Sequence, residues 1–431
     1  MTEDRQNLLD QIEAFLFDTV RALESPPARS GPGRPLVLPA TCLWAGLLVC
    51  VLRGFDSQLA LWRLLAVDGF WHFGSYSVSD QAVYKRLAQS GLEPLQNLFE
   101  KISAVLHERL APFVQHQLAP FAREVLALDA TTLDKVARVL PTLRGVAAGD
   151  DQLLPGKAAG LFDLRRQQWR KVVFVQEPRQ NDKVQARTLV EGLPPETLLL
   201  ADLGYFGFAW FDDLTQRQIW WISRLREKTS YTLRHCFYAQ GDTRDEIVFL
   251  GQYRADRAAS AVRLVQFRVG ERRYQYITNV LDPRLLPMGE IAQLYARRWD
   301  IEMAFNLIKT DLGLHLLWSA KASVIQQQLW AVLIVAQILQ GLRLEIAGRA
   351  GVDPYDVSMP LLVQYMPQFA RMGADPIQVF VEKGRFARFI RPSRRIRLQV
   401  PVIPEADLVP LPEGLILDRK ARHAQRNCGP R

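Results

Sequence analysis

Between residues 122 and 228, short strand-like apolar runs alternate with helix-like segments, and this alternation constrains the fold more than any other feature of the chain. The runs EVLALDATTL, QWRKVVFVQ and TLLLADLGYF are rich in residues favoured in strands, whereas NDKVQARTLVEGL has the spacing of a helix. With 431 residues, 48% of them hydrophobic, the chain can bury a sizeable core. We therefore expect an α/β fold with a mixed sheet.

The flanking segments predict further regions. Apolar positions recur at helical spacing before residue 115, and β-rich runs separated by the turn signals QGD and VGE follow the core. Two long helices are expected after them, at about 288–311 and 321–348. The predicted regions are a helical N-terminal DNA-binding domain (1–115), a first core part (116–228), a β-rich insertion (229–281), a second core part (282–348) and a C-terminal region with a basic tail (349–431).

Composition narrows the classes of protein. The chain has 54 lysine and arginine residues against 45 aspartate and glutamate residues, a net charge of +9 that favours a polyanionic partner such as nucleic acid. Four widely spaced cysteines form no CxxC pair, so neither a zinc knuckle nor a disulfide framework is indicated. The apolar stretches 43–52 and 329–339 fall short of the roughly 20 residues of a membrane span and are interpreted as buried core helices. We expect a cytoplasmic protein without membrane contact.

Two aspartates stand where apolar runs end. Asp129 closes VLALD and Asp202 closes TLLLAD, so each is expected at the carboxyl end of a core strand, the edge at which open α/β sheets bind ligands. The two strands must be neighbours if the pair is to share a cation. Either aspartate alone could instead begin a turn.

A polar stripe on the first long predicted helix is more specific. Tyr295, Arg298, Glu302 and Lys309 cluster within roughly 60° at about 100° per residue. An apolar stripe lies beside them, so Glu302 is held next to the core, where Arg298, Lys309 or a divalent metal must offset its charge. An ordinary i,i+4 pair between Arg298 and Glu302 is the simpler alternative. Trp299 could stack on a base, but filling the core is the favoured interpretation.

Taken together, these motifs resemble the DDE transposases of bacterial insertion sequences, in the family named after insertion sequence 4. Its hallmark, Tyr-x2-Arg-x3-Glu-x6-Lys, is matched at every position. LALDATT around Asp129 and ADLGYF around Asp202 are similar to the family's first and second catalytic aspartates, although Leu203 stands where an arginine or another polar residue is more usual. The β-rich segment before Glu302 is similar to the family's insertion in a ribonuclease H-like core.

The resemblance implies a mechanism and a set of ligands. It implies cleavage of DNA at transposon ends and strand transfer into target DNA, with two Mg²⁺ ions for which Mn²⁺ is expected to substitute. The partners would be the double-stranded terminal inverted repeats and the target DNA, with a homodimer in the synaptic complex and association with the nucleoid. The implied metal-binding and catalytic residues are Asp129, Asp202 and Glu302, and the implied phosphate-binding residues are Tyr295, Arg298 and Lys309.

Two further segments are candidate DNA contacts. VSDQAVYKRLAQSG predicts a helix capped by Ser79 that suits the major groove, with Lys85 and Arg86 as contacts, although an ordinary surface helix fits equally well. RFARFIRPSRRIRL, at 385–398, interleaves arginines with apolar side chains as phosphate-tracking segments do, but a snorkelling helix or a strand edge would look the same.

Two other functions remain open at this stage. A nuclease with the same metal core would hydrolyse DNA or RNA without rejoining it, and its gene would lack flanking inverted repeats. A catalytically inactive relative would only bind DNA, and the intact acidic triplet argues against that alternative.

Overall fold

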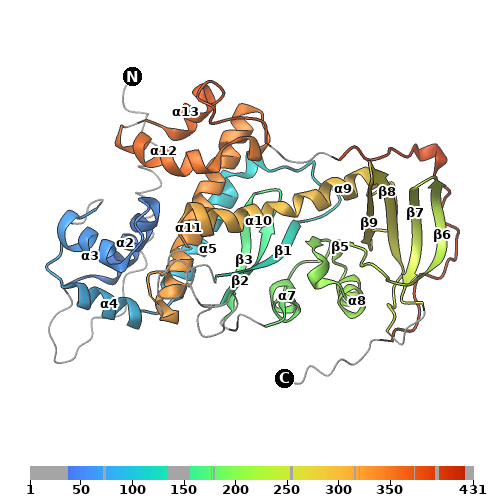
Figure 1. Ribbon diagram of the computed structural model, residues 1–431, viewed down its shortest axis with the longest axis horizontal. Coiled ribbons are helices and arrows are strands. Elements are labelled where there is room, and N and C mark those ends of the chain that lie inside the picture. Colours follow the sequence, from blue (N-terminus) through green and yellow to red (C-terminus); the bar gives the residue numbers. More distant parts are fainter. Residues whose placement is uncertain are drawn as a thin grey trace.

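One sheet of nine strands runs through the described part of the chain in the order β3-β2-β1-β4-β5-β9-β8-β7-β6 (Figure 1). The computed structural model describes residues 37–70, 74–133, 156–175, 177, 180–252, 256–314, 317–319, 321–372, 374–393 and 398–422. The strands are β1 (Val125–Thr132), β2 (Lys157–Asp163), β3 (Gln168–Val175), β4 (Leu198–Ala201), β5 (Trp220–Arg224), β6 (Tyr231–Gln240), β7 (Thr243–Leu250), β8 (Val262–Val269) and β9 (Arg272–Thr278).

The inner half of the sheet is mixed, as predicted. β1 pairs antiparallel with β2, and β2 pairs antiparallel with β3, whereas β4 lies parallel between β1 and β5. All four residues of β4 are buried, which is expected of a parallel strand covered on both faces. Leu128 of β1 pairs with Ala201 of β4, so the two strands present their next residues at the same edge.

The outer half of the sheet is antiparallel. The predicted β-rich segment does form four strands, and Gly241 and Gly270 take positive φ in the turns that QGD and VGE predicted. These strands do not make a separate sheet, because Ile222 of β5 pairs with Thr278 of β9 and carries the core sheet onward. The main-chain segment around 409–418 adds hydrogen bonds along this half, from Val409 to the carbonyl of Phe237 among others.

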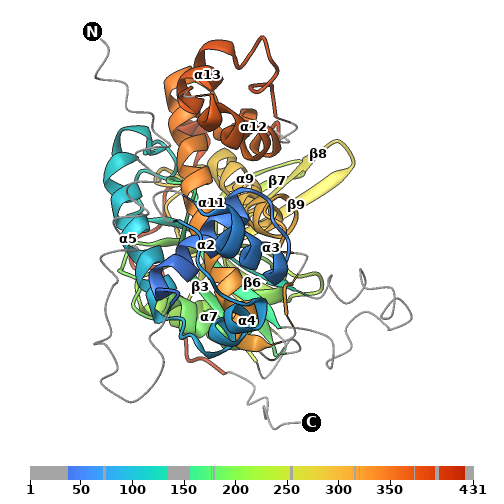
Figure 2. The same ribbon diagram turned by 90° about the vertical axis from the view of Figure 1, so that its left-hand side faces the viewer.

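Helices cover both faces of the inner sheet (Figures 1 and 2). α7 and α8 pack with one buried cluster, and α9, α10 and α11 pack with the other. The helices are α2 (Ala40–Leu52), α3 (Gln58–Arg63), α4 (Asp80–Gln89), α5 (Glu93–Arg109), α7 (Asp182–Val190), α8 (Phe208–Gln216), α9 (Met288–Arg297), α10 (Trp299–Asn306), α11 (Ala322–Ala350), α12 (Met359–Arg371) and α13 (Pro376–Lys383). Two π-helical turns span Leu64–Asp68 and Leu307–Asp311, and 3-10 turns span Ala111–Phe113, Leu203–Tyr205, Pro354–Asp356 and Glu405–Asp407.

The N-terminal helices share a core with the long helix α11. Buried side chains of α2, α4 and α5 belong to the same hydrophobic cluster as those of α11, so α11 joins the N-terminal region to the sheet. Both apolar stretches predicted as core helices are confirmed, within α2 and α11. By length and composition α11 could cross a membrane, but 94% of its most apolar window is buried inside the fold, as in the core helix of a globular protein. The first 36 residues of the predicted helical N-terminal region and part of the predicted basic tail lie outside the described residues.

Candidate active site

The two aspartates lie side by side at one edge of the sheet. Each carboxylate accepts a hydrogen bond from nearby main chain, Asp129 from the amide of Ala130 at 2.8 Å and Asp202 from the amide of Gly204 at 2.8 Å. A Cβ at position 204 would lie 2.9 Å from the Asp202 oxygen, so glycine suits this turn. β4 ends before Asp202 as predicted. β1 instead continues past Asp129 to Thr132, because its other neighbour, β2, keeps pairing with it.

Arg298 connects the helix to this edge. Its Nη2 atom donates to Glu302 Oε1 at 2.5 Å, and its Nη1 atom donates to Asp129 Oδ2 at 3.4 Å. The ion pair between Arg298 and Glu302 is the simpler i,i+4 alternative that the sequence offered. The same guanidinium, however, also reaches Asp129 of β1. The Arg298 side chain is only 11% exposed, so both ion pairs are shielded from water. One buried cation therefore spans two of the three predicted metal ligands.

The charges of Asp202 and Glu302 both act on the Asp129 carboxyl group. The pKa of Asp129 is raised to about 6, chiefly because burial disfavours the charged form, while the Ala130 amide and Arg298 lower it and the charges of Asp202 and Glu302 raise it further. Within the described ranges, no three acidic, histidine or cysteine side chains surround a single point in this conformation. Arg298 is the counter-ion that Asp129 and Glu302 share.

The remaining members of the polar stripe are engaged within the protein. The Tyr295 ring packs against Tyr276 with centroids 5.0 Å apart, and burial raises its pKa to about 12. Lys309 Nζ donates to Thr131 Oγ1 at 2.9 Å and to the carbonyl of Thr132 at 3.2 Å, which ties the helix to the end of β1. The polar stripe therefore extends from β9 to β1. It crosses the edge of the sheet at which Asp129 and Asp202 lie, called the acidic edge below.

The predicted single helix at 288–311 is interrupted twice. α9 gives way to α10 at Arg298, whose amide bonds to the carbonyl of Tyr295 three residues back, a tighter turn than an α-helix makes. A π-helical turn then carries Lys309. Such turns are frequent at functional sites, and here both fall on residues of the polar stripe.

The interpretation of Trp299 as a core residue is wrong. Its side chain is 60% exposed, and Met303, one helical turn later, is 47% exposed. Ile301 and Phe305 already fill the apolar side of α10, and Trp299 lies on the other side of the helix. A large aromatic surface therefore stands open to solvent within four residues of Glu302.

Sequence reasoning missed two arginines, one at the end of β5 and one just after it. Arg226 Nη2 donates to the carbonyl of Leu203 at 3.1 Å, and its guanidinium lies 4.9 Å from the ring centre of Phe206. Arg226 thus supplies a positive group beside Asp202, where Leu203 departs from the family pattern. Arg224, at the end of β5, contributes to the field around Tyr295. No local sequence signal marks them, because their approach to this edge depends on the parallel pairing of β5 with β4.

The predicted DNA contacts outside this edge of the sheet differ in how exposed their side chains are. The helix with Ser79 as its cap is confirmed, since Ser79 Oγ accepts from the amide of Ala82 at 3.3 Å, and Lys85 is exposed. Arg86 is half-buried and donates to the carbonyl of Leu38, which favours a structural role over a DNA contact. In the C-terminal segment, Phe386 is 95% exposed.

A family of known proteins matches the part of the chain that contains this site. The family described as "Transposase DDE domain" matches residues 120–338, a little more than half of the chain and a range that holds all three carboxylates. The chain belongs to this family. The resemblance inferred from the acidic and Tyr-Arg-Glu-Lys motifs is therefore confirmed at the level of the DDE transposase family.

The individual DDE transposases that resemble this chain share little sequence identity with it. "Transposase InsG for insertion sequence element IS4" from Escherichia coli (strain K12) is 28% identical over 167 residues, which are 36% of this chain and 37% of that protein. The match thus spans little more than a third of the curated relative. Among solved structures, "Cryo-EM structure of piggyBac transposase synaptic complex with hairpin DNA (SNHP)" is similar over 94% of this chain and 85% of that chain, with 8% identity and a TM-score of 0.41.

Proposed function

We propose that this chain is a transposase that cleaves double-stranded DNA at transposon ends and joins the freed ends to target DNA. The observation that carries the proposal is the double ion pair of Arg298 with Asp129 and Glu302, beside the neighbouring strand that ends before Asp202. The order β3-β2-β1-β4-β5, with β2 antiparallel to β1, supports a ribonuclease H-like core for residues 116–228 and 282–348. The helical region 1–115 would be the DNA-binding domain.

The donor set suits two Mg²⁺ or Mn²⁺ ions. All three candidates are carboxylates, the hard oxygen ligands these cations prefer; burial chiefly, and then the charges of Asp202 and Glu302, raise the pKa of Asp129. Asp129, Asp202 and Glu302 would hold these ions. When bound, the ions would activate a water or 3′-hydroxyl nucleophile and stabilise the leaving oxyanion.

The other residues would bind and orient DNA. Arg224 and Arg226 border the acidic edge and suit phosphate oxygens, Arg226 as a planar fork. Tyr295 and Lys309 flank the edge on the helix side, as the family pattern implies. The exposure of Trp299 favours the stacking role that was the less favoured alternative. A synaptic homodimer holding two transposon ends follows from the need to cut both ends together.

A plasmid carrying two terminal repeats, incubated with the protein and Mg²⁺, tests this function. We expect breaks at both repeat ends and insertion of the excised segment into a second plasmid. Breaks without joined products would favour the nuclease alternative, and binding without breaks would favour the inactive relative.

Metal binding should weaken as the pH falls below about 6. Asp129 is protonated there, so a cation must displace a proton. For folding the sign is the reverse: because the folded-state pKa is raised, the contribution of Asp129 to stability is full below its usual pKa and is lost as the pH rises through about 6. Metal-free melting curves from pH 4 to pH 7 measure this effect, and Asp129→Asn should flatten their pH dependence. An identical pH dependence in the variant would contradict the assignment.

Arg298→Gln should strengthen metal binding in the absence of DNA. The change removes the guanidinium that shares Asp129 and Glu302, so Mn²⁺ meets less competition, by on the order of ten-fold in affinity. Titration of Mn²⁺ followed by electron paramagnetic resonance measures this. Arg170→Gln, which removes an arginine paired with Glu124, is the matched control. Unchanged or weaker Mn²⁺ binding in Arg298→Gln would show that Arg298 does not compete with the metal.

A further inference from the structure

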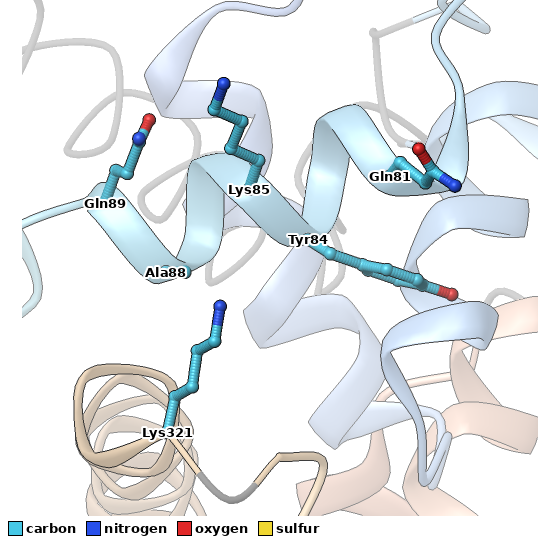
Figure 3. Close-up of a pocket in the computed structure, with 6 residues that line it drawn as sticks. All are labelled: Gln81, Tyr84, Lys85, Ala88, Gln89 and Lys321. Carbon is cyan, nitrogen blue, oxygen red and sulfur yellow. The ribbon is translucent and has the colours of Figure 1, made fainter.

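A hollow of about 590 Å³ lies between α4 and the start of α11. Figure 3 shows Lys321 pointing from the beginning of α11 toward Ala88 of α4, while Lys85 and Gln89 project from α4. Among its described lining residues the hollow has two lysines and no acidic side chain. Four of the six side chains are exposed, which suits a polymer that passes over the surface better than an enclosed small molecule. They are Gln81, Lys85, Gln89 and Lys321.

α11 holds α4 in a fixed position beside this hollow. The last carbonyls of a helix lack partners within the helix, and here the first two turns of α11 supply them. Ser323 Oγ donates to the carbonyl of Ala88 at 3.1 Å, and Gln327 Nε2 donates to the carbonyls of Leu87 at 2.6 Å and Ser90 at 3.2 Å. Gln327 is fully buried, so these bonds are protected from water. α4 cannot change its angle to α11 without breaking them.

A second connection ties the same region to the segment that follows the Glu302 helix. Gln58 of α3 donates to the carbonyl of Trp318 at 2.6 Å, three residues before Lys321. Trp62 of the same helix donates to the carbonyl of Val78, just before α4. Side-chain hydrogen bonds therefore join α4 to the start of α11, and α3 to Trp318 and to the residue just before α4.

We propose that Lys321 binds a backbone phosphate of the DNA duplex whose major groove receives α4, so that α11 and α4 together form one DNA-binding surface. The inference rests on the proposed function and adds a contact from the catalytic region itself. Gln81, Lys85 and Gln89 recur every four residues on α4 and would face the bases, while Lys321 would fix the position of the strand at the groove edge without reading sequence. The duplex would thereby be held at a set distance from Asp129, Asp202 and Glu302.

The salt dependence of binding tests the proposal. The full chain, in the presence of a chelator, is titrated against two fluorescent duplexes, one carrying a terminal repeat and its flank and one with that sequence scrambled. Lys321→Ala should weaken both equally, by roughly three- to ten-fold, and lower the slope of log affinity against log salt by about 0.9, the value for one phosphate contact. Lys321→Arg should restore both quantities. Gln81→Ala should weaken only the terminal-repeat duplex, because it removes a base contact.

Lys101→Ala, which removes an exposed lysine of α5, is the matched control and should leave the slope unchanged. Melting temperatures equal to that of the parent protein would show that the variants fold. The proposal is overturned if Lys321→Ala binds both duplexes with unaltered affinity and slope while the parent protein shows a steep slope. Failure of the parent protein to bind either duplex would instead contradict the proposed function, so the two failures are distinguishable.

Discussion

Glu302→Gln should reduce metal-dependent DNA cleavage on the order of 1,000-fold, equivalent to about 4 kcal/mol of transition-state stabilisation. The amide keeps the size of the side chain but loses the charge that would hold a cation. It also keeps an oxygen to accept the bond from Arg298, which is 2.5 Å from the present carboxylate, so the helix should stay in place. Cleavage of a labelled terminal-repeat duplex over a range of Mg²⁺ concentrations measures the loss.

Binding must be measured on the same variant. Affinity for the duplex in the presence of a chelator should be unchanged or slightly increased, because a negative charge near the DNA is removed. Glu100→Gln, which makes the same change on the exposed side of α5, should retain full cleavage. Residual cleavage within ten-fold of the parent protein would exclude Glu302 as a metal ligand.

The second large effect concerns stability, and it lies in the outer half of the sheet. Asp245→Ala should lower the free energy of unfolding by about 3–5 kcal/mol, because it leaves a buried guanidinium without its counter-ion. Arg263 is 0% exposed and Asp245 1% exposed, and they form two hydrogen bonds, of 2.7 and 2.6 Å. Arg263 also donates to the carbonyl of Leu286 at 2.6 Å, just before α9 begins. Urea unfolding measures the loss.

A double variant tests whether the isolated charge of Arg263 causes the loss of stability. Asp245→Leu combined with Arg263→Met removes both charges and leaves the carbonyls of Leu286 and Asp282 without the Arg263 donor, so it should cost about 1–3 kcal/mol, less than the single change. If the double variant were as unstable as Asp245→Ala, the isolated charge would not be the cause. Because the pair anchors the approach to α9, Asp245→Ala should also weaken cleavage by misplacing Glu302.

Much of the fold could be predicted because its signals are local. The runs around Asp129 and Asp202 are strongly apolar, so the identity of both strands followed from periodicity, although β1 runs past Asp129 to Thr132. Pairing between strands is not local. β9 pairs with β5 because one edge of β5 is left unpaired by the core strands. That edge exists only once the sheet has assembled.

The residues of the candidate site could be predicted from the sequence, but fewer of their contacts could. The spacing from Tyr295 to Lys309 placed the stripe on one side of a helix, yet an ideal helix contains neither the tight turn at Arg298 nor the π-helical turn at Lys309. Trp299 was misjudged because a tryptophan beside an apolar stripe is usually packed, whereas here the neighbouring side chains had already filled the core. The approach of Arg226 to Leu203 required the parallel pairing of β4 with β5.

Anomalous X-ray scattering from Mn²⁺ in crystals of the protein bound to a terminal-repeat duplex tests most directly whether these carboxylates form a metal centre. We expect two peaks about 4 Å apart, one between Asp129 and Asp202 and one between Asp129 and Glu302, with Arg298 withdrawn from at least one carboxylate. Mn²⁺ peaks that lie away from all three side chains, in a complex whose DNA is cleaved on adding the metal, would contradict the assignment.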